Sequence, residues 1–391
     1  MTTNSIKYKF VLPVLMSFFV MSFVDMVGIG VDRVKLDFNL TDTMAQLIPS
    51  AAFLWFLLLS VSVGIFQDRI GKKMTLNLGM LITAMGLFLP VIHYTYISTL
   101  IGFAFLGIGN TIVQVSANPL LADAVPDSRR SSFLSLSQFI KAIGSMIAPA
   151  LAGMFATRFG DWKLVFLAFG IVSLLTMVWM ASQKISESKP DRAPATLGSS
   201  FRLLGNPFIL MMVLGIFVVV GIDVGMNSIS GQFFMQKLMV ASESAEKARS
   251  IYFFGRMLGT FGGAILLARM SSHRFLLWSS ILSILFILVF MFNSNPLAGW
   301  ILTFIIGLTV SNIFPLIYSI TIGRYPDRSN EISGLMIMAV SGGGLFPPIM
   351  GWLSDNVNIT ASIFVLVFCA AYLVVLSFIA LKDQKQNVTE A

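Results

Sequence analysis

The stretch Gly64-Ile-Phe-Gln-Asp-Arg-Ile-Gly-Lys-Lys73 separates two long apolar runs, near residues 44–66 and 74–95. Gly64 allows a helix to approach its neighbour closely, and Gly71 suits a tight turn. Asp68 offers a negative charge to the end of a facing helix, while Arg69 and the two lysines favour the cytoplasmic side of a membrane. The stretch therefore predicts a cytoplasmic loop between two transmembrane helices, with Gly64, Asp68, Arg69 and Gly71 acting in conformational change.

The composition extends this prediction to the whole chain. Of its 391 residues, 56% are hydrophobic and 11% are charged, whereas soluble proteins carry roughly a quarter charged residues. The single cysteine, Cys369, excludes a disulfide within the chain. We find no metal-ligand cluster, catalytic triad, phosphate loop or nucleic-acid-binding stripe, and no cleavable signal. We therefore expect an all-α membrane protein that is not an enzyme, with no cofactor, metal or nucleic acid partner.

Apolar runs long enough to cross the bilayer recur along the chain. They predict twelve transmembrane helices in two six-helix bundles, residues 1–183 and 207–391, joined by a polar cytoplasmic linker at 184–206. The predicted spans, numbered here in chain order, are 10–31, 44–66, 74–95, 97–122, 131–157, 163–183, 207–231, 250–269, 275–293, 298–322, 333–352 and 360–381.

The basic residues predict the orientation. With the N-terminus in the cytoplasm, 17 of the 26 lysines and arginines fall on the inner side and 7, Arg249 among them, in outer loops. The other two, Lys141 and Arg256, fall inside spans. An excess of basic residues in inner loops is typical of membrane proteins. We therefore expect both termini in the cytoplasm and, for a bacterial chain, a place in the inner membrane.

The stretch 64–73 resembles the major facilitator signature G-x-x-x-D-R-x-G-R/K-K. The corresponding loop of the second half, Gly263 to Arg274, keeps a glycine and basic residues, as a degraded copy in a duplicated fold does. The resemblance implies the major facilitator fold, in which spans 1, 4, 7 and 10 line a central cavity.

Four ionisable residues lie at membrane depth in this reading: Asp25, Lys141, Asp223 and Arg256. Each costs at least roughly 2.5–3.5 kcal/mol on insertion, so each needs a partner inside the bundle. The two acids occupy equivalent positions on spans 1 and 7, within reach of Lys141 and Arg256 respectively. Two interpretations stay open: structural ion pairs, or proton coupling by Asp25, Asp223 and Lys141, with Arg256 as a permanent partner.

Polar side chains also form stripes along the spans expected to line the cavity. Residues four apart share one face of a helix, and amides suit sugar hydroxyls. Hydrogen bonding between helices is the alternative for each residue. A glycine run centred on Gly343 predicts a hinge in span 11, unless it serves close packing. The candidate substrate-binding residues are Gln114, Asn118, Gln138, Lys141, Asn227 and Asn312.

Several of these stretches together resemble the fucose–galactose–glucose:proton symporter family. They are Gln114 to Pro119, Leu136 to Pro149, Gly221 to Gly225, Ser311 to Pro315 and Gly334 to Asp355. The resemblance runs through both halves and implies an L-fucose-permease-like fold and proton-coupled uptake of a monosaccharide by a monomer. Sodium coupling stays open.

Two departures from that family bear on the mechanism. Gln114 stands where fucose-permease-like members carry a glutamate, and Lys141 where an asparagine is usual. Coupling then runs through Asp25 with Lys141 as its partner, or Lys141 receives the carboxylate of an acidic sugar or other organic anion. We favour the neutral hexose or deoxyhexose, because Asp25 would otherwise lose its counterion. A drug-efflux antiporter is disfavoured by the amide-rich stripes, and a non-transporting sensor by the lack of a signalling domain.

Overall fold

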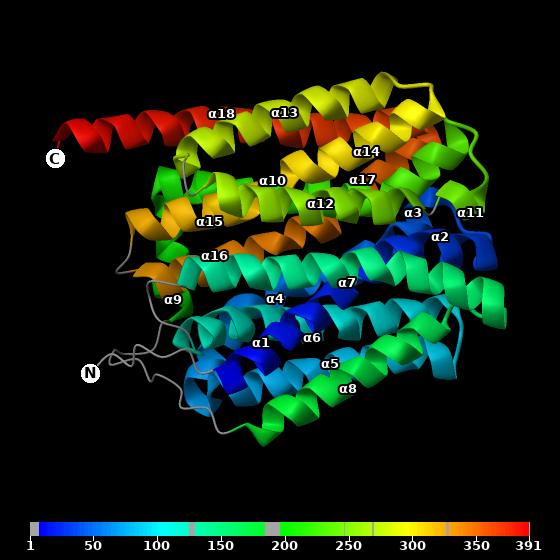
Figure 1. Ribbon diagram of the computed structural model, residues 1–391, viewed down its shortest axis with the longest axis horizontal. Coiled ribbons are helices and arrows are strands. Elements are labelled where there is room, and N and C mark those ends of the chain that lie inside the picture. Colours follow the sequence, from blue (N-terminus) through cyan, green and yellow to red (C-terminus); the bar gives the residue numbers. More distant parts are fainter. Residues whose placement is uncertain are drawn as a thin grey trace.

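The computed structural model describes residues 8–124, 130–183, 196–245, 247–267, 270–325 and 328–390, without some side chains, those of Asp68 and Arg69 among them. The described residues form long helices that run roughly side by side (Figure 1). Both chain termini lie at one end of this bundle. The opposite end, where α3 and α11 lie, is called the distal end below.

The first half of the chain forms one group of helices. α5 packs against α6 and α8, and α6 also packs against α4. The elements are α1 (Tyr8–Met21), the 3₁₀ turn η1 (Ser22–Met26), α2 (Val27–Phe38), α3 (Asp42–Ala45), α4 (Leu47–Ile70), α5 (Lys72–Ile92), α6 (Tyr96–Ala124), α7 (Arg130–Phe159) and α8 (Leu164–Ser182).

The second half repeats this arrangement. α10 packs against α17 and α18, α13 against α18, and α12 against α14. The elements are α10 (Pro207–Gln236), α11 (Ser242–Ala245), α12 (Lys247–Leu266), α13 (Ser272–Phe292), α14 (Pro296–Val310), α15 (Ile313–Arg324), α16 (Ser329–Met338), η5 (Ala339–Ser341), α17 (Gly342–Asn356) and α18 (Ile359–Glu390).

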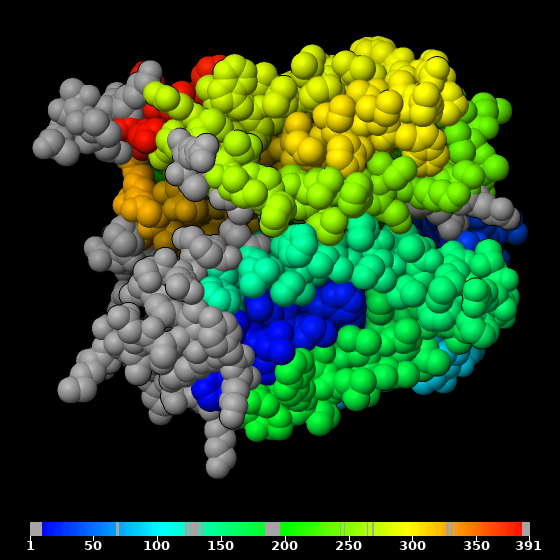
Figure 2. Space-filling model, in the orientation of Figure 1, coloured from blue at the N-terminus to red at the C-terminus, as the bar shows by residue number. Residues whose placement is uncertain are grey.

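Eleven helical segments of the described chain are long and apolar enough to cross a membrane. The remaining long helix, α12, is not among them and carries Lys247, Arg249 and Arg256. It packs against α7 of the other half along the seam that Figure 2 shows, and Phe254, Phe261 and Ile265 are exposed on its outer face. Arg249 is fully buried on the inner side of α12, where a charged group is kept away from lipid.

Two predicted span boundaries were wrong. Span 1 was expected to end at residue 31, but α2 continues to Phe38, and Asn39 in the left-handed conformation (φ 51°) ends it. Span 8 begins at Lys247 rather than at residue 250. Both errors arose because charged residues were taken as the end of a helix. Within the predicted linker range 184–206 lie two short helices, α9 (Leu197–Arg202) and η3 (Leu203–Gly205).

The motif at the end of α4 is partly explained by the geometry. Gly71 has φ 93°, a conformation that favours glycine, and it makes the turn into α5. Lys73 donates to the carbonyls of Ala181 (2.9 Å) and Gln183 (2.5 Å), at the C-terminal end of α8, where a positive charge is favourable. The close-packing role predicted for Gly64 was wrong, because a side chain there would meet nothing within 4 Å. The predictions for Asp68 and Arg69 lie outside the described side chains.

Candidate functional site

The middle of the first transmembrane segment is broken by the 3₁₀ turn η1, which contains Asp25. Two amides from opposite halves of the protein hold the turn. Asn110 of α6 donates to the carbonyl of Met21 (2.7 Å), and Asn227 of α10 donates to the carbonyl of Asp25 (2.8 Å). Backbone that departs from an α-helix at membrane depth needs such partners. Asn227, predicted to bind substrate, thus ties the two halves together at this turn.

Asp25 is buried, with 8% of its surface exposed, and its carboxylate accepts a hydrogen bond from Ser145 of α7 (2.5 Å). The predicted ion pair between Asp25 and Lys141 is absent from the described residues, where the Lys141 ammonium has no carboxylate within ion-pair distance. Lys141 lies one helical turn before Ser145 on the same face of α7, and the Ser145 hydroxyl is the group that meets the Asp25 carboxylate. That prediction was wrong.

The second predicted pair is confirmed. Arg256 of α12 forms an ion pair with Asp223 of α10 at 2.8 Å, and the two side chains are 20% and 19% exposed. Tyr252, one turn away on α12, donates to the other carboxylate oxygen of Asp223 (2.7 Å). Both oxygens of Asp223 therefore have a partner. Tyr252 was not anticipated, although its spacing of four residues from Arg256 places both on one face of the helix.

These groups form a single electrostatic unit, called the central cluster: Asp25, Lys141, Ser145, Asp223, Tyr252 and Arg256. The charges of Asp25 and Lys141 act on Asp223 across the seam between the halves. Two acids and two bases give the ionised cluster a net charge of zero. Among the described residues the Nε atom of Arg256 is buried without a partner. The described cluster thus contains an unpaired donor, the Nε of Arg256, and the ammonium of Lys141, which has no carboxylate within ion-pair distance.

The amides predicted on span 4 are used largely inside α6. The side chain of Gln114, 7% exposed, donates to Asn110 (3.1 Å), and Asn118 donates to the carbonyl of Gln114 (3.1 Å). The chain from Asn118 through Gln114 to Asn110 therefore ends on the Met21 carbonyl at the broken helix. This contact couples α6 to the position of η1.

The other two predicted ligands differ in their surroundings. Asn312 is buried in the break between α14 and α15, and it donates to the carbonyl of Gly259 (2.7 Å) on α12. This contact joins two helices of one half, as the interhelical alternative predicted. Gln138 lies one turn from Lys141 on α7 and is partly exposed. Gly343 is the second residue of α17, and a side chain there would meet Val224 at 2.7 Å and Phe53 at 2.9 Å. The glycine allows α17 to contact helices of both halves where its path changes.

A second arginine–aspartate pair was missed by the sequence analysis. Arg249 of α12 pairs with Asp32 of α2, and both side chains are 1% exposed. Arg249 also donates to the carbonyls of Asn227 (2.7 Å) and Ser228 (3.4 Å) on α10. A side chain at Gly231 would meet both members of the pair, so that glycine provides their space. The number of ionisable residues predicted at membrane depth was therefore too low, and Arg249 does not lie in a loop.

Further polar contacts join the halves at the distal end. Asp355 of α17 accepts hydrogen bonds from the backbone N–H groups of Asp42 (3.0 Å) and Thr43 (2.8 Å), at the start of α3. The carboxylate of Asp42 in turn accepts from Ser354 (2.6 Å) and pairs with Lys35. These contacts close the distal end in the conformation described.

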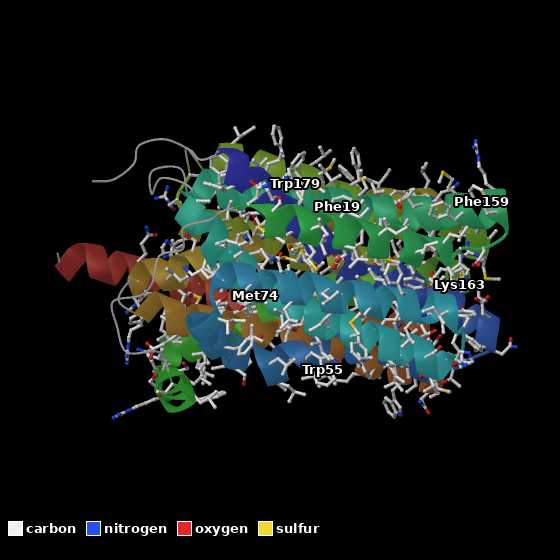
Figure 3. The ribbon with its side chains drawn as sticks, turned by 90° about the horizontal axis from the view of Figure 1, so that it is seen from below. Phe19, Trp55, Met74, Phe159, Lys163 and Trp179 are labelled. Atoms are coloured by element: carbon white, nitrogen blue, oxygen red, sulfur yellow. The ribbon has the colours of Figure 1, made fainter. Side chains whose placement is uncertain are left out.

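The distal end of the first half carries its own polar group. Asp37 accepts from Tyr94 (2.6 Å) and Trp162 (3.1 Å), and the Lys163 ammonium lies 4.7 Å from the centre of the Tyr94 ring. Burial, together with the Asp37 carboxylate, raises the pKa of Tyr94 well above its usual value. The tyrosine therefore stays protonated and keeps donating. Figure 3 shows Lys163 and Phe159 at this end of the bundle, away from Trp179.

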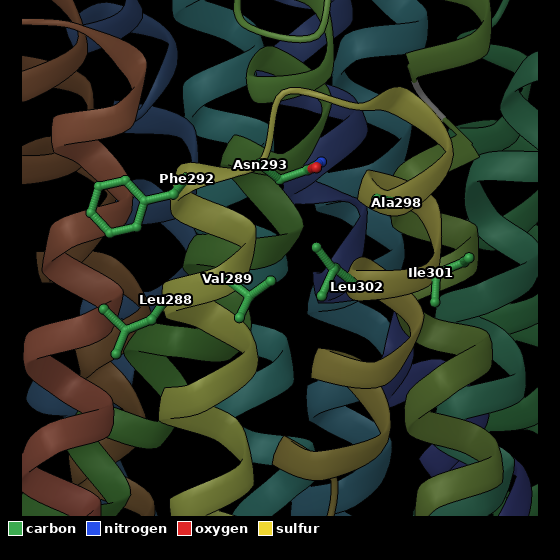
Figure 4. Close-up of a pocket in the computed structure, with 7 residues that line it drawn as sticks. All are labelled: Leu288, Val289, Phe292, Asn293, Ala298, Ile301 and Leu302. Atoms are coloured by element: carbon green, nitrogen blue, oxygen red, sulfur yellow. The ribbon is translucent and has the colours of Figure 1, made fainter.

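A surface hollow lies between the distal ends of α13 and α14 (Figure 4). It is lined by Asn293 and six apolar residues, Leu288, Val289, Phe292, Ala298, Ile301 and Leu302. None of the central cluster takes part in it. An apolar hollow in a membrane-embedded region suits lipid chains better than a sugar, so we place the candidate site at the central cluster.

Comparison with known proteins agrees with this architecture. The family model described as Major Facilitator Superfamily matches residues 14–245 and 218–391. The chain belongs to the major facilitator superfamily. It is 25% identical over 404 residues to a glucose/galactose transporter of Brucella abortus, covering 98% of this chain and 97% of that one. It is 23% identical to the L-fucose-proton symporter of Escherichia coli, covering 90% and 87%.

The same fold is found among solved structures. The crystal structure of a fucose:proton symporter in the outward conformation superposes with a TM-score of 0.72 at 18% identity, covering 95% of this chain and 98% of that one. This confirms the predicted all-helical major facilitator fold and the resemblance to the fucose–galactose–glucose symporter relatives. The chain is thus a multi-pass membrane transporter and not an enzyme.

Proposed function

We propose that this protein imports a neutral monosaccharide, a hexose or deoxyhexose, together with a proton by alternating access. The observation that carries the proposal is the central cluster, which places two acids and two bases at mid-depth between the halves. The named relatives transport glucose and galactose or fucose. The excess of basic residues at the end with the termini supports a cytoplasmic location for that end, so that the distal end faces the outside. We take the working unit to be a monomer in the bacterial inner membrane.

Asp25 is the proposed proton carrier. Among the described side chains its carboxylate accepts a hydrogen bond from one hydroxyl, that of Ser145, and its backbone carbonyl is bonded to the opposite half through Asn227. A change in its charge therefore acts where a broken helix of one half touches the other. Asp223, in contrast, has an arginine and a tyrosine on its two oxygens, so both oxygens are already bound within its own half. Sodium in place of the proton is the alternative that the assay below separates.

The test is uptake of radiolabelled glucose, galactose and fucose into proteoliposomes under an imposed pH or sodium gradient. We expect a pH gradient to drive accumulation, Asp25→Asn to abolish it, and exchange of sugar across the membrane to persist. Ser145→Ala is the matched control, because it removes the hydrogen bond and keeps the carboxylate. Accumulation that survives in Asp25→Asn, or that follows sodium alone, contradicts the proposed role.

A second candidate function is favoured by the absence of an ion pair at Lys141 among the described residues. An anionic sugar or other organic anion entering with one proton would leave the charge of the central cluster unchanged. Asp25 would not lose a counterion, because its observed partner is Ser145. Under this candidate, uronates raise the thermal stability of the purified protein, and Lys141→Asn abolishes that effect. If only neutral hexoses raise the thermal stability, and they still do so in Lys141→Asn, the result supports transport of a neutral monosaccharide instead.

A further inference from the structure

Two buried glutamines near the distal end have no partner among the described residues. Gln46, between α3 and α4, is 0% exposed, and Gln232 of α10 is 1% exposed. Neither the nitrogen nor the oxygen of either amide has a hydrogen-bond partner. A buried amide with all its polar atoms unpaired is unusual and costs free energy. Two such residues, one from each half, indicate that the conformation described is not the one in which these groups act.

Both glutamines lie one helical turn from a contact that joins the two halves. The region around Gln46 and Gln232 is called the distal layer below. Gln236 of α10 donates to Asp42 (3.3 Å), which connects the two halves. Gln46 follows Asp42 by four residues and Gln232 precedes Gln236 by four, so each lies one helical turn deeper on the same face. Gln46 also lies against α17, because a side chain at Gly351 would meet its Cγ at 2.9 Å.

Other buried polar atoms of α2 and α10 also lack a partner among the described residues. They include the Oδ1 of Asn227, the Oγ of Ser230 and the Oδ1 of Asp32. Because α2 and α10 belong to different halves and contact each other, we expect separation of the distal ends to make these atoms available to a solute from that side.

We propose that Gln46 and Gln232 form an outer docking subsite for an uncharged polyhydroxy compound, a neutral monosaccharide, which is open only when the distal ends separate. The inference rests on the proposed function. An amide both donates and accepts, so two of them suit adjacent hydroxyl groups. Asp42 stays paired with Lys35 of its own half when the halves part, and Asp32 and Arg249 carry opposite charges, so these four side chains have no net charge that would attract an anion.

The first experiment is cysteine labelling, which the chain allows because Cys369 is its one cysteine and is buried. In a Cys369→Ala background, Gln46→Cys and Gln232→Cys are exposed to a membrane-impermeant thiol reagent in right-side-out vesicles. We expect both to react, and glucose or galactose to slow the reaction while glucuronate does not. Thr83→Cys is the matched control, because Thr83 is fully buried and unpaired but lies within one half. It stays unlabelled.

Protection by sugar can arise from occupancy or from closure of the distal end, and transport kinetics separate these causes. Gln46→Leu and Gln232→Leu keep the bulk of the side chain and remove its polar atoms. We expect KM for uptake from the distal side to rise about five- to tenfold, the effect of losing one to two hydrogen bonds to the sugar. KM for efflux from the opposite side stays within about twofold, since this layer is closed to a sugar from that side.

The results can overturn the subsite without touching the proposed function. If the cysteines are labelled but no sugar protects them, or if KM from the distal side is unchanged in both leucine variants, the layer is only a water passage. If neither cysteine is labelled while wild-type vesicles accumulate sugar, the layer does not open and the subsite is wrong. If labelling occurs but the wild-type protein accumulates none of the sugars, the proposed function fails instead.

Discussion

The protein contains two arginine–aspartate pairs on the same helix, α12, and they differ in where the acid comes from. Arg256 pairs with Asp223 of its own half, and about a fifth of each side chain stays exposed. Arg249 reaches across the seam to Asp32 of the other half, and both side chains are 1% exposed. The two arginines are seven residues apart, so they lie on nearly the same face of α12, two turns from one another.

The difference indicates two separate tasks. A pair within one half moves with that half as a unit, so alternating access leaves it intact. A pair between the halves has to separate when they part, and a buried pair is costly to leave half-formed. The Asp32–Arg249 pair therefore stabilises one conformation, in which the distal end is closed, whereas Asp223–Arg256 maintains the electrostatic character of the central cluster in every conformation.

The largest effect is expected from breaking the pair between the halves. Arg249→Met removes the guanidinium and leaves the Asp32 carboxylate buried without a counterion, which costs about 3–5 kcal/mol. We expect a marked fall in thermal stability in detergent and loss of sugar accumulation in vesicles. The exposed distal end should also increase labelling of Gln232→Cys by an impermeant thiol reagent.

The control for this prediction is the double variant Asp32→Asn with Arg249→Met, which removes both charges. Replacement of a buried pair by neutral residues is far less costly than removal of one partner. Stability should therefore recover to near that of the wild type, while labelling of the distal layer stays high. If stability does not recover, the arginine acts mainly through its bonds to the Asn227 and Ser228 carbonyls.

The missed pair shows what a single sequence lacks. The twelve spans follow from apolar runs, and the ion pair of Asp223 with Arg256 follows from two charges on neighbouring spans. Asp32 stands beside Arg33 and close to Lys35, and such a run of charged residues is typical of a loop. Its partner is 217 residues away in the chain, and no local pattern connects them. The signal available was the apolar period that continues through Val31 and Val34, both fully buried.

The four charged members of the central cluster were predicted, and so was the Asp223–Arg256 pair, but Ser145 and Tyr252 were not. Asp25 and Lys141 both lie in helical segments long and apolar enough to cross a membrane. Lys141 and Ser145 share one face of α7, so the position of α7 along its own axis decides which of them meets the carboxylate. Hydropathy and spacing do not resolve a shift of one helical turn. The 3₁₀ turn around Asp25 was likewise not predictable, because its stability comes from Asn110 and Asn227 on other helices.

The pair within one half should tolerate neutralisation better. Asp223→Asn keeps the shape of the side chain and leaves the partly exposed Arg256 unpaired, so we expect a loss of about 2–3 kcal/mol, below the fully buried case. Labelling of the distal layer should stay at the wild-type level, since this change does not touch the contact between the halves. Increased labelling equal to that of Arg249→Met would remove the proposed distinction between the two pairs.

The variant with the smallest expected effect, Tyr252→Phe, tests whether Asp223 is charged in the folded protein. Tyr252→Phe removes one hydrogen bond to its carboxylate, and a bond to a charged group contributes about 1.5–3 kcal/mol. Tyr372→Phe is the matched control, because the half-buried Tyr372 hydroxyl donates to the neutral carbonyl of Met211 (3.0 Å), which is worth about 0.5–1.5 kcal/mol.

Both variants delete one oxygen atom from a tyrosine of the same half. The difference between their free energies of unfolding therefore shows whether the acceptor of the lost hydrogen bond is charged. A larger loss in Tyr252→Phe than in Tyr372→Phe means that Asp223 is ionised beside Arg256, as a permanent pair requires. Equal losses would mean that Asp223 carries a proton when the distal end is closed. In that case Asp223, rather than Asp25, would hold the transported proton, and the pair within one half would take part in coupling after all.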